Sequence, residues 1–224
     1  MNTEYLENGF AFFDRFYSEG FTGSLLDALE ESGALSYDTA FDANLYRSVP
    51  AIAELCTSEP LIELVKDATG LDAKPVKAFI LDKTSASNWG LDWHQDLKIT
   101  VKEKVEAEGY HNWTTEAGVT HVVPPVNVLQ NMTALRIHLD DCNEQNGAMW
   151  VLPGTHRQGI IDAQDVPAIL HETKIYTCNA AKGSVMLMSQ LLLHKSPYSL
   201  SEMPRRVLHI EYSAEALAEE LEWW

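Results

Sequence analysis

The sequence predicts a mainly β fold, an all-β sandwich or jelly roll with helices packed outside it. The hydrophobic pattern changes from helical to extended at about Val76, and eight short apolar or alternating runs then follow one another between turn residues. Strands of this length and spacing are typical of sandwiches and jelly rolls. The runs are VKAFILDK, LKITV, TALRIHLD, AMWVLP, KIYTCN, SVMLMS, LLLHKS and RVLHIEY.

The region before these strands is predicted to be mostly helical. One helix is expected over Ser24–Ser32, whose leucines share a face. Another is expected over Ser58–Thr69, because Ser58 can cap its start, Pro60 suits its first turn and Gly70 can end it. We expect these helices to pack against the strands.

A long segment, about residues 102–131, interrupts the strand series and contains glycines and a proline pair. A structureless stretch of this length in a compact domain is usually a lid or a binding loop. No repeat or linker divides the chain. The sequence therefore predicts one domain over residues 1–224, with a helical part (1–75) packed on a jelly-roll core (76–212) that carries this lid loop.

The composition is that of a soluble globular protein, with 46% hydrophobic and 22% charged residues. Its net charge of −17 repels phosphate groups, so neither nucleic acid nor an anionic membrane is an expected partner. No apolar run approaches the roughly 20 residues that span a bilayer. The acidic N-terminus does not resemble a secretory signal, and a cytoplasmic location is expected. Nothing in the sequence indicates an oligomeric state.

The three cysteines are scattered and form no CxxC pair, which argues against a disulfide framework and against a thiolate metal site. Another set of ligands is present. His94 and Asp96 lie two residues apart in WHQDLKITV, at the head of an expected strand, and side chains at i and i+2 share a face. His194, in LLLHKS, can supply a third ligand from across the closed sheet. Two histidines and one carboxylate are the ligand set of non-haem iron(II) oxygenases.

Arg205 and Arg206 follow in MPRRVLHIEY, and Arg205 stands eleven residues after His194. A guanidinium on a neighbouring strand can hold a carboxylate through two parallel hydrogen bonds. If it holds the far carboxylate of a 2-oxo diacid, the 2-oxo acid end can reach a metal at the three ligands. The pattern thus predicts sites for a metal and for a 2-oxo acid co-substrate.

The flanking sequences resemble the phytanoyl-CoA dioxygenase family, and in particular its short bacterial members. The motifs are WHQD, GVTHVVPPVNVLQNMTALRIHLDD, NGAMWVLPGTHRQG, LLLHKS and PRRVLHIEY, in this order over about Val76 to Tyr212. The resemblance implies a double-stranded β-helix (a cupin-like jelly roll), with iron(II), 2-oxoglutarate and O2 as cofactor and co-substrates. It also implies hydroxylation of an unactivated C–H of a small organic metabolite, with release of succinate and CO2.

Carried over residue by residue, the resemblance makes His94, Asp96 and His194 the iron ligands and Arg205 the 2-oxoglutarate arginine. Related halogenases carry a small residue in place of the carboxylate, so Asp96 favours hydroxylation. Gln95 and Ser196 match positions that can contact the co-substrate, and Arg136 matches a position beside it that can serve co-substrate or substrate. Lys83 leads into the strand of the metal motif and can face either the pocket or the solvent, so it is a further candidate for co-substrate binding.

Three other classes of protein remain open from the sequence, one of them a structural or interaction module, which would leave the ordered ligand set unexplained. A cupin-like hydrolase or isomerase would not need Arg205, and a catalytically inactive small-molecule-binding protein would not need the complete ligand set. No basic cluster near the expected lid suggests a coenzyme A site, which favours a small free metabolite as substrate. Arg136, if it faces the pocket, would favour a substrate with a carboxylate. His138 and His209 are expected to be buried mid-strand residues rather than ligands.

Overall fold

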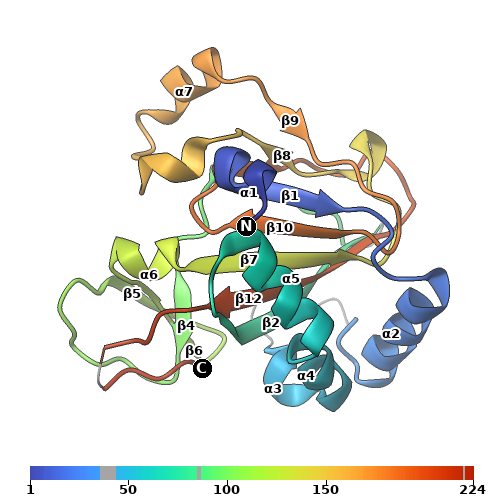
Figure 1. Ribbon diagram of the computed structural model, residues 1–224, viewed down its shortest axis with the longest axis horizontal. Coiled ribbons are helices and arrows are strands. Elements are labelled where there is room, and N and C mark those ends of the chain that lie inside the picture. Colours follow the sequence, from blue (N-terminus) through green and yellow to red (C-terminus); the bar gives the residue numbers. More distant parts are fainter. Residues whose placement is uncertain (36–43, 85–86, 219) are drawn as a thin grey trace.

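The computed structural model describes residues 1–35, 44–84, 87–218 and 220–224 (Figure 1). Its α-helices are α1 (Thr3–Asn8), α2 (Glu19–Glu31), α3 (Leu45–Ser48), α4 (Pro50–Cys56), α5 (Glu59–Thr69), α6 (Val126–Gln130) and α7 (Val166–Glu172). Its strands are β1 (Phe10–Phe13), β2 (Lys74–Lys83), β3 (Leu91–His94), β4 (Ile99–Val101), β5 (His111–Glu116), β6 (Val119–Val123), β7 (Met132–His138), β8 (Trp150–Val151), β9 (Tyr176–Thr177), β10 (Val185–Ser189), β11 (His194–Ser196) and β12 (Arg205–Ser213). Two 3-10 turns lie at Glu144–Asn146 and Thr155–Gln158.

The predicted jelly roll is confirmed. A five-stranded sheet has the order β1-β10-β7-β12-β2, and a four-stranded sheet has the order β3-β11-β8-β9. Neighbouring strands are antiparallel throughout both sheets. A smaller third sheet, β4-β6-β5, extends beyond them. Non-consecutive strands lie side by side in each sheet, so residues far apart in sequence meet between the sheets.

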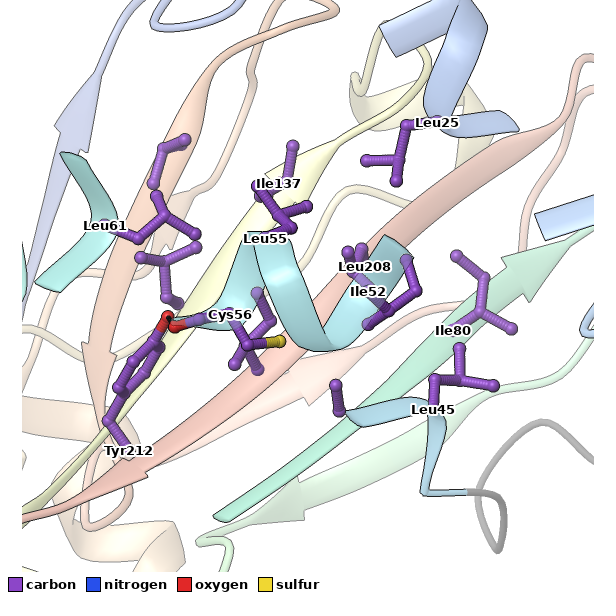
Figure 2. Packing of buried hydrophobic residues seen from close by; sticks show 14 of the residues in the cluster. Leu25, Leu45, Ile52, Leu55, Cys56, Leu61, Ile80, Ile137, Leu208 and Tyr212 are labelled. Carbon is purple, nitrogen blue, oxygen red and sulfur yellow. Dashed lines mark hydrogen bonds between the residues drawn. The ribbon is translucent and has the colours of Figure 1, made fainter. Parts of the chain in front are cut away.

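Alternation along β12 separates the two faces of the five-stranded sheet. Leu208, Ile210 and Tyr212 point outward into the largest apolar cluster, together with residues of α2, α4 and α5. Figure 2 shows α4 lying across β7 and β12 in this cluster. The Tyr212 hydroxyl donates a hydrogen bond of 2.8 Å to the backbone oxygen of Cys56 at the end of α4. The residues between them on β12 face the other sheet, as the period of two requires.

Both predicted helices are confirmed, with one change of boundary. α5 begins after Ser58, has its proline in the first turn, and ends at Gly70, whose φ of +79° is the left-handed conformation that favours glycine. α2 begins at Glu19 rather than Ser24, because the Ser18 side chain accepts a hydrogen bond from Phe21 N and caps the helix earlier.

Two segments differ from the expectation. The mostly helical N-terminal part also contributes a strand, β1, which pairs with β10 at one edge of the five-stranded sheet. The segment 102–131 is not an irregular loop, because β5 and β6 form a hairpin and α6 follows it. The hairpin turns at Ala117 and Gly118, both with positive φ, as a two-residue turn between twisted strands requires. None of the helices in the described ranges combines the length and the apolar character that a bilayer crossing needs.

The contact between α4 and the five-stranded sheet predicts a large loss of stability for Ile52→Ala. Ile52 is fully buried in the main cluster, so its truncation leaves a cavity between helix and sheet. We expect the free energy of unfolding to fall by about 2–5 kcal/mol in a denaturant titration. Glu54→Ala, at an exposed position of the same helix, is the control and should change stability by less than about 0.5 kcal/mol. Similar effects for both variants would contradict this packing.

Candidate metal centre

The antiparallel pairing of β3 with β11 sets His94 directly opposite His194. Their imidazole centroids are 4.2 Å apart. The expectation that His94 and Asp96 share the head of one strand was wrong in detail, since β3 ends at His94 and Asp96 lies in the link to β4. The backbone N–H of Asp96 donates to the backbone oxygen of Gln190 (3.1 Å), which directly follows β10, and this bond holds Asp96 beside the two rings.

The three side chains converge as a metal site would require. Nε2 of His94 and Nε2 of His194 each lie 3.7 Å from a different carboxylate oxygen of Asp96. One ligand atom from each residue lies within 4.8 Å of the others, and no other group of at least three such residues occurs in the described part of the chain. Nδ1 of His94 contacts the backbone oxygen of Asp92 (2.6 Å), and Nδ1 of His194 contacts the backbone oxygen of Leu192 (2.9 Å). Each carbonyl holds the proton on Nδ1, which leaves Nε2 as the free ligand atom.

The charges of the site suit a cation. Burial alone would raise the pKa of Asp96, but His194 and then His94 outweigh it, so this pKa lies below its usual value. Burial is the main cause that lowers the pKa of His194 to about 4. At neutral pH the site therefore holds a carboxylate and a neutral His194 imidazole, the protonation states that metal binding requires.

A cavity of about 110 Å³ opens beside these three residues, between the two sheets. Its walls are apolar on one side and polar around the three side chains. Besides His94, Asp96 and His194, it is lined by Phe79, Leu81, Trp89, Leu91, Arg136, Met149, Ser196 and His209. No residue of the segment 102–131 is among them, so the role of that segment as a lid stays a prediction.

Arg205 and Lys83 both lie against the ring of Trp89, which lines this cavity. They are paired in register on β12 and β2, and both are almost completely buried. Nε and Nη2 of Arg205 have no hydrogen-bond partner among the described residues. Lys83 Nζ donates to Ser196 Oγ (2.9 Å) and to the Pro197 oxygen, and burial, then Arg205, lowers its pKa to about 7. No carboxylate in the described part of the chain forms an ion pair with either side chain, so the guanidinium and the protonated form of the lysine together form a site for an anion.

The neighbouring arginine is already engaged. Arg206 points to the other side of β12 and donates from Nε and Nη2 to the two carboxylate oxygens of Asp140, each at 2.8 Å. Its backbone N–H donates to the same carboxylate. The structure thus separates the arginine pair into one structural member, Arg206, and one with free donors, Arg205.

Arg136 faces the cavity from β7. Its Nη1 donates a hydrogen bond of 3.0 Å to Nδ1 of His209, which stands opposite it on β12. Burial, followed by Arg136, lowers the pKa of His209 to about 3, so this imidazole is neutral. The expectation that His209 is a buried mid-strand residue agrees with its position, although it also reaches the cavity.

Gln95 occupies a different place from the one expected. Its Nε2 donates to the backbone oxygens of Gly159 (2.8 Å) and Leu191 (2.6 Å), and its Oε1 accepts from Ile161 N (2.8 Å). Its side chain lies on the opposite side of the chain from His94 and Asp96, outside the cavity lining. Gln95 thus links the segment that carries His94 and Asp96 to the loop near residue 160. Both atoms of its side-chain amide are engaged in hydrogen bonds to backbone groups.

Sequence reasoning did not find the apolar wall made by Phe79, Leu81, Leu91 and Met149. Phe79 and Leu81 alternate with outward residues on β2, in the same phase as Lys83. The alternation is readable in the sequence, but only the position of Lys83 in the folded sheet shows which phase faces inward.

The buried Glu211, two residues beyond His209, predicts a pH-dependent stability. Burial raises its pKa to about 7, although Lys77 acts in the opposite direction. Because the carboxyl ionises near 4.5 in the unfolded chain, the folded protein retains a proton that the unfolded chain loses between pH 4.5 and 7. Stability therefore falls as the pH rises through this window.

We expect Glu211→Gln to be more stable than the wild type at about pH 8, by on the order of 3 kcal/mol, and the difference to shrink toward pH 4.5. Denaturant unfolding across this range measures it. Glu63→Gln, at an exposed position of α5, is the control. A difference between Glu211→Gln and wild type that does not change with pH would contradict the buried carboxyl.

Solved structures of similar fold were found by comparison. EctD from S. alaskensis, solved with 2-oxoglutarate and 5-hydroxyectoine, has a TM-score of 0.70 and 17% identity over 94% of this chain and 73% of that chain. SnoK, a non-heme alpha ketoglutarate dependent carbocyclase from nogalamycin biosynthesis, has a TM-score of 0.68 and 14% identity over 94% of this chain and 81% of its own. HygX from Streptomyces hygroscopicus, solved with nickel, 2-oxoglutarate and hygromycin B, has a TM-score of 0.65 and 16% identity over 93% of this chain and 84% of its own. At these identities the likeness shows the fold.

A sequence comparison with curated proteins gave no match. The family comparison gave a clear one, because residues 5–207 match the model for phytanoyl-CoA dioxygenase (PhyH). This match spans both sheets and includes all three candidate metal ligands and Arg205. The chain belongs to the phytanoyl-CoA dioxygenase family.

Proposed function

We propose that the chain is an iron(II)- and 2-oxoglutarate-dependent dioxygenase that hydroxylates an unactivated C–H of a small organic metabolite. The co-substrates would be O2 and 2-oxoglutarate, and the other products succinate and CO2. The observation that carries the proposal is the convergence of His94, Asp96 and His194 next to a buried arginine with free donors.

The chemistry of the residues fits the metal. Two imidazole nitrogens and one carboxylate, without a thiolate, suit iron(II), and a set of three ligands leaves coordination positions open for other groups. Among solved relatives of the same fold, EctD was obtained with bound Fe and with 2-oxoglutarate. Family membership and this ligand set together support the same cofactor here.

The residues behind Trp89 fit a carboxylate of the co-substrate. Arg205 can donate from Nε and Nη2, which point to no protein acceptor among the described residues. Lys83 and Ser196 lie beside it and can add further donors. A bound anion would neutralise this buried positive charge, so binding of a diacid and stability of the site are coupled.

The bound metal, with 2-oxoglutarate and O2, supplies the oxidising power, and the protein supplies position and a dry environment. His94, Asp96 and His194 hold the metal from one side. Arg205 and Lys83 would bind the far carboxylate of the diacid and so orient it. Phe79, Leu81, Leu91 and Met149 surround the reacting C–H with apolar surface and exclude water.

The cofactor proposal predicts a visible charge-transfer band when apoprotein receives iron(II) and then 2-oxoglutarate without oxygen. We expect the band in the wild type and its loss in His194→Ala, since this variant removes one of three ligands. Lys195→Ala, at the next position of β11, is the control and should keep the band. Absence of the band in folded, iron-loaded wild type would favour a cupin-like hydrolase or a binding protein.

The hydroxylation step needs a separate measurement, because the structural relatives include a carbocyclase and an epimerase. With isotopically labelled O2, a hydroxylated product gains one labelled oxygen atom and succinate gains the other. If the product gains no oxygen, the reaction is ring formation, desaturation or epimerisation instead of hydroxylation. The assignment of iron(II) and 2-oxoglutarate would be unaffected.

The arginine pair gives a matched test of the co-substrate site. Arg205→Gln should raise the dissociation constant of 2-oxoglutarate by roughly 10- to 150-fold, as expected for loss of a hydrogen bond to a charged group. Arg206→Gln should change it by less than about threefold, since Arg206 is bonded to Asp140 on the other face of β12. Titration of the charge-transfer band measures both constants. The reverse order of effects would assign the co-substrate to Arg206.

A further inference from the structure

Arg136 and His209 form a second polar pair inside the cavity. The Arg136 donor bond to Nδ1 of His209 leaves the imidazole proton on Nε2. This Nε2–H and the Nε–H of Arg136 have no partner among the described residues, although both atoms are buried. Both residues line the cavity, and two unsatisfied buried donors there point to an acceptor that the protein itself does not provide.

The positive charge of Arg136 also lacks a partner at ion-pair distance. The side chain is 5% exposed, and in the described ranges no carboxylate forms an ion pair with it. Asp96 contacts the two imidazoles and acts on the charge of Arg136 only from beyond ion-pair distance. A guanidinium does not lose its proton in a protein, so a buried one requires an anion. The missing acceptor is therefore negatively charged.

The co-substrate does not account for this anion. His209 is four residues from Arg205 on β12, so their Cα atoms are roughly 13 Å apart along the strand, and Arg136 stands beside His209. A 2-oxo diacid has two carboxylates. One would bind at Arg205 and the other at the metal, which leaves no third carboxylate for the pair of Arg136 and His209.

We infer that the substrate is a small carboxylic acid whose carboxylate binds Arg136 and the Nε2–H of His209. The inference rests on the proposed function, because it takes the Arg205 site and the metal to be occupied by 2-oxoglutarate. The rest of the substrate is apolar, since Phe79, Leu91 and Met149 line the remaining wall of the cavity.

The test measures binding of matched acids and amides to the iron(II) and 2-oxoglutarate complex under anaerobic conditions. The probes are hexanoate and 3-phenylpropanoate, each paired with its amide, and the readout is the change in the visible band. We expect each acid to bind the wild type at least about tenfold more tightly than its amide. Arg136→Gln should remove this preference, whereas Arg157→Gln, at an exposed position, should retain it.

Two results would overturn the inference. Equal affinity of acid and amide for the wild type would show that no carboxylate is recognised. A loss of 2-oxoglutarate affinity in Arg136→Gln as large as that in Arg205→Gln would assign Arg136 to the metal-bound end of the co-substrate. The expected change in that affinity is less than about threefold.

Failure of the proposed function gives a different result. If the wild type forms no charge-transfer band, the cofactor assignment fails, and calorimetric titration of the metal-free protein with the same acids and amides then decides the carboxylate site. A preference for acids that Arg136→Gln abolishes supports the site in this case as well. Equal affinity of acid and amide for the metal-free wild type overturns it.

Discussion

The ladder between β3 and β11 is the interaction on which the rest of the site depends. It pairs His94 with His194, two residues one hundred positions apart in the sequence. β11 also pairs with β8 on its other edge. Gln190, in the link between β10 and β11, accepts the hydrogen bond from Asp96 N. A register shift of one residue would turn His194 to the opposite face of the sheet and remove it from the other ligands.

The five-stranded sheet divides stability and function between its faces. Its outward face is apolar and packs against the helices, where Leu208 and Ile137 lie in the main cluster. Its inward face carries Arg136, Lys83 and Arg205, whose burial is costly without anions. The apolar clusters on both faces must therefore offset the cost of these buried cations until ligands bind. Such a division is expected where a site is assembled before its ligand arrives.

The sequence was sufficient for the strand series, the fold class and the three candidate ligands, because alternation and the order of motifs are local features. It was insufficient where long-range pairing decides. β1 is only four residues long and lies between helices, so its role in the sheet depends on β10. Gln95 sits inside the metal motif, yet its amide bonds to backbone near residues 159–161 and 191, which no local pattern reveals.

The two adjacent arginines at the start of β12 point to opposite faces of the sheet and therefore have different roles. Arg206 is fixed on the outside by two side-chain bonds and one backbone bond to Asp140. These bonds set the rotation of the strand where it enters the sheet, and the period of two then directs Arg205 inward. The same period carries His209 to the inner face beside Arg136. The ladders of β12 with β2 and β7 keep this period along the strand, so Arg205 and His209 reach the inner face together and both anion sites lie on one strand.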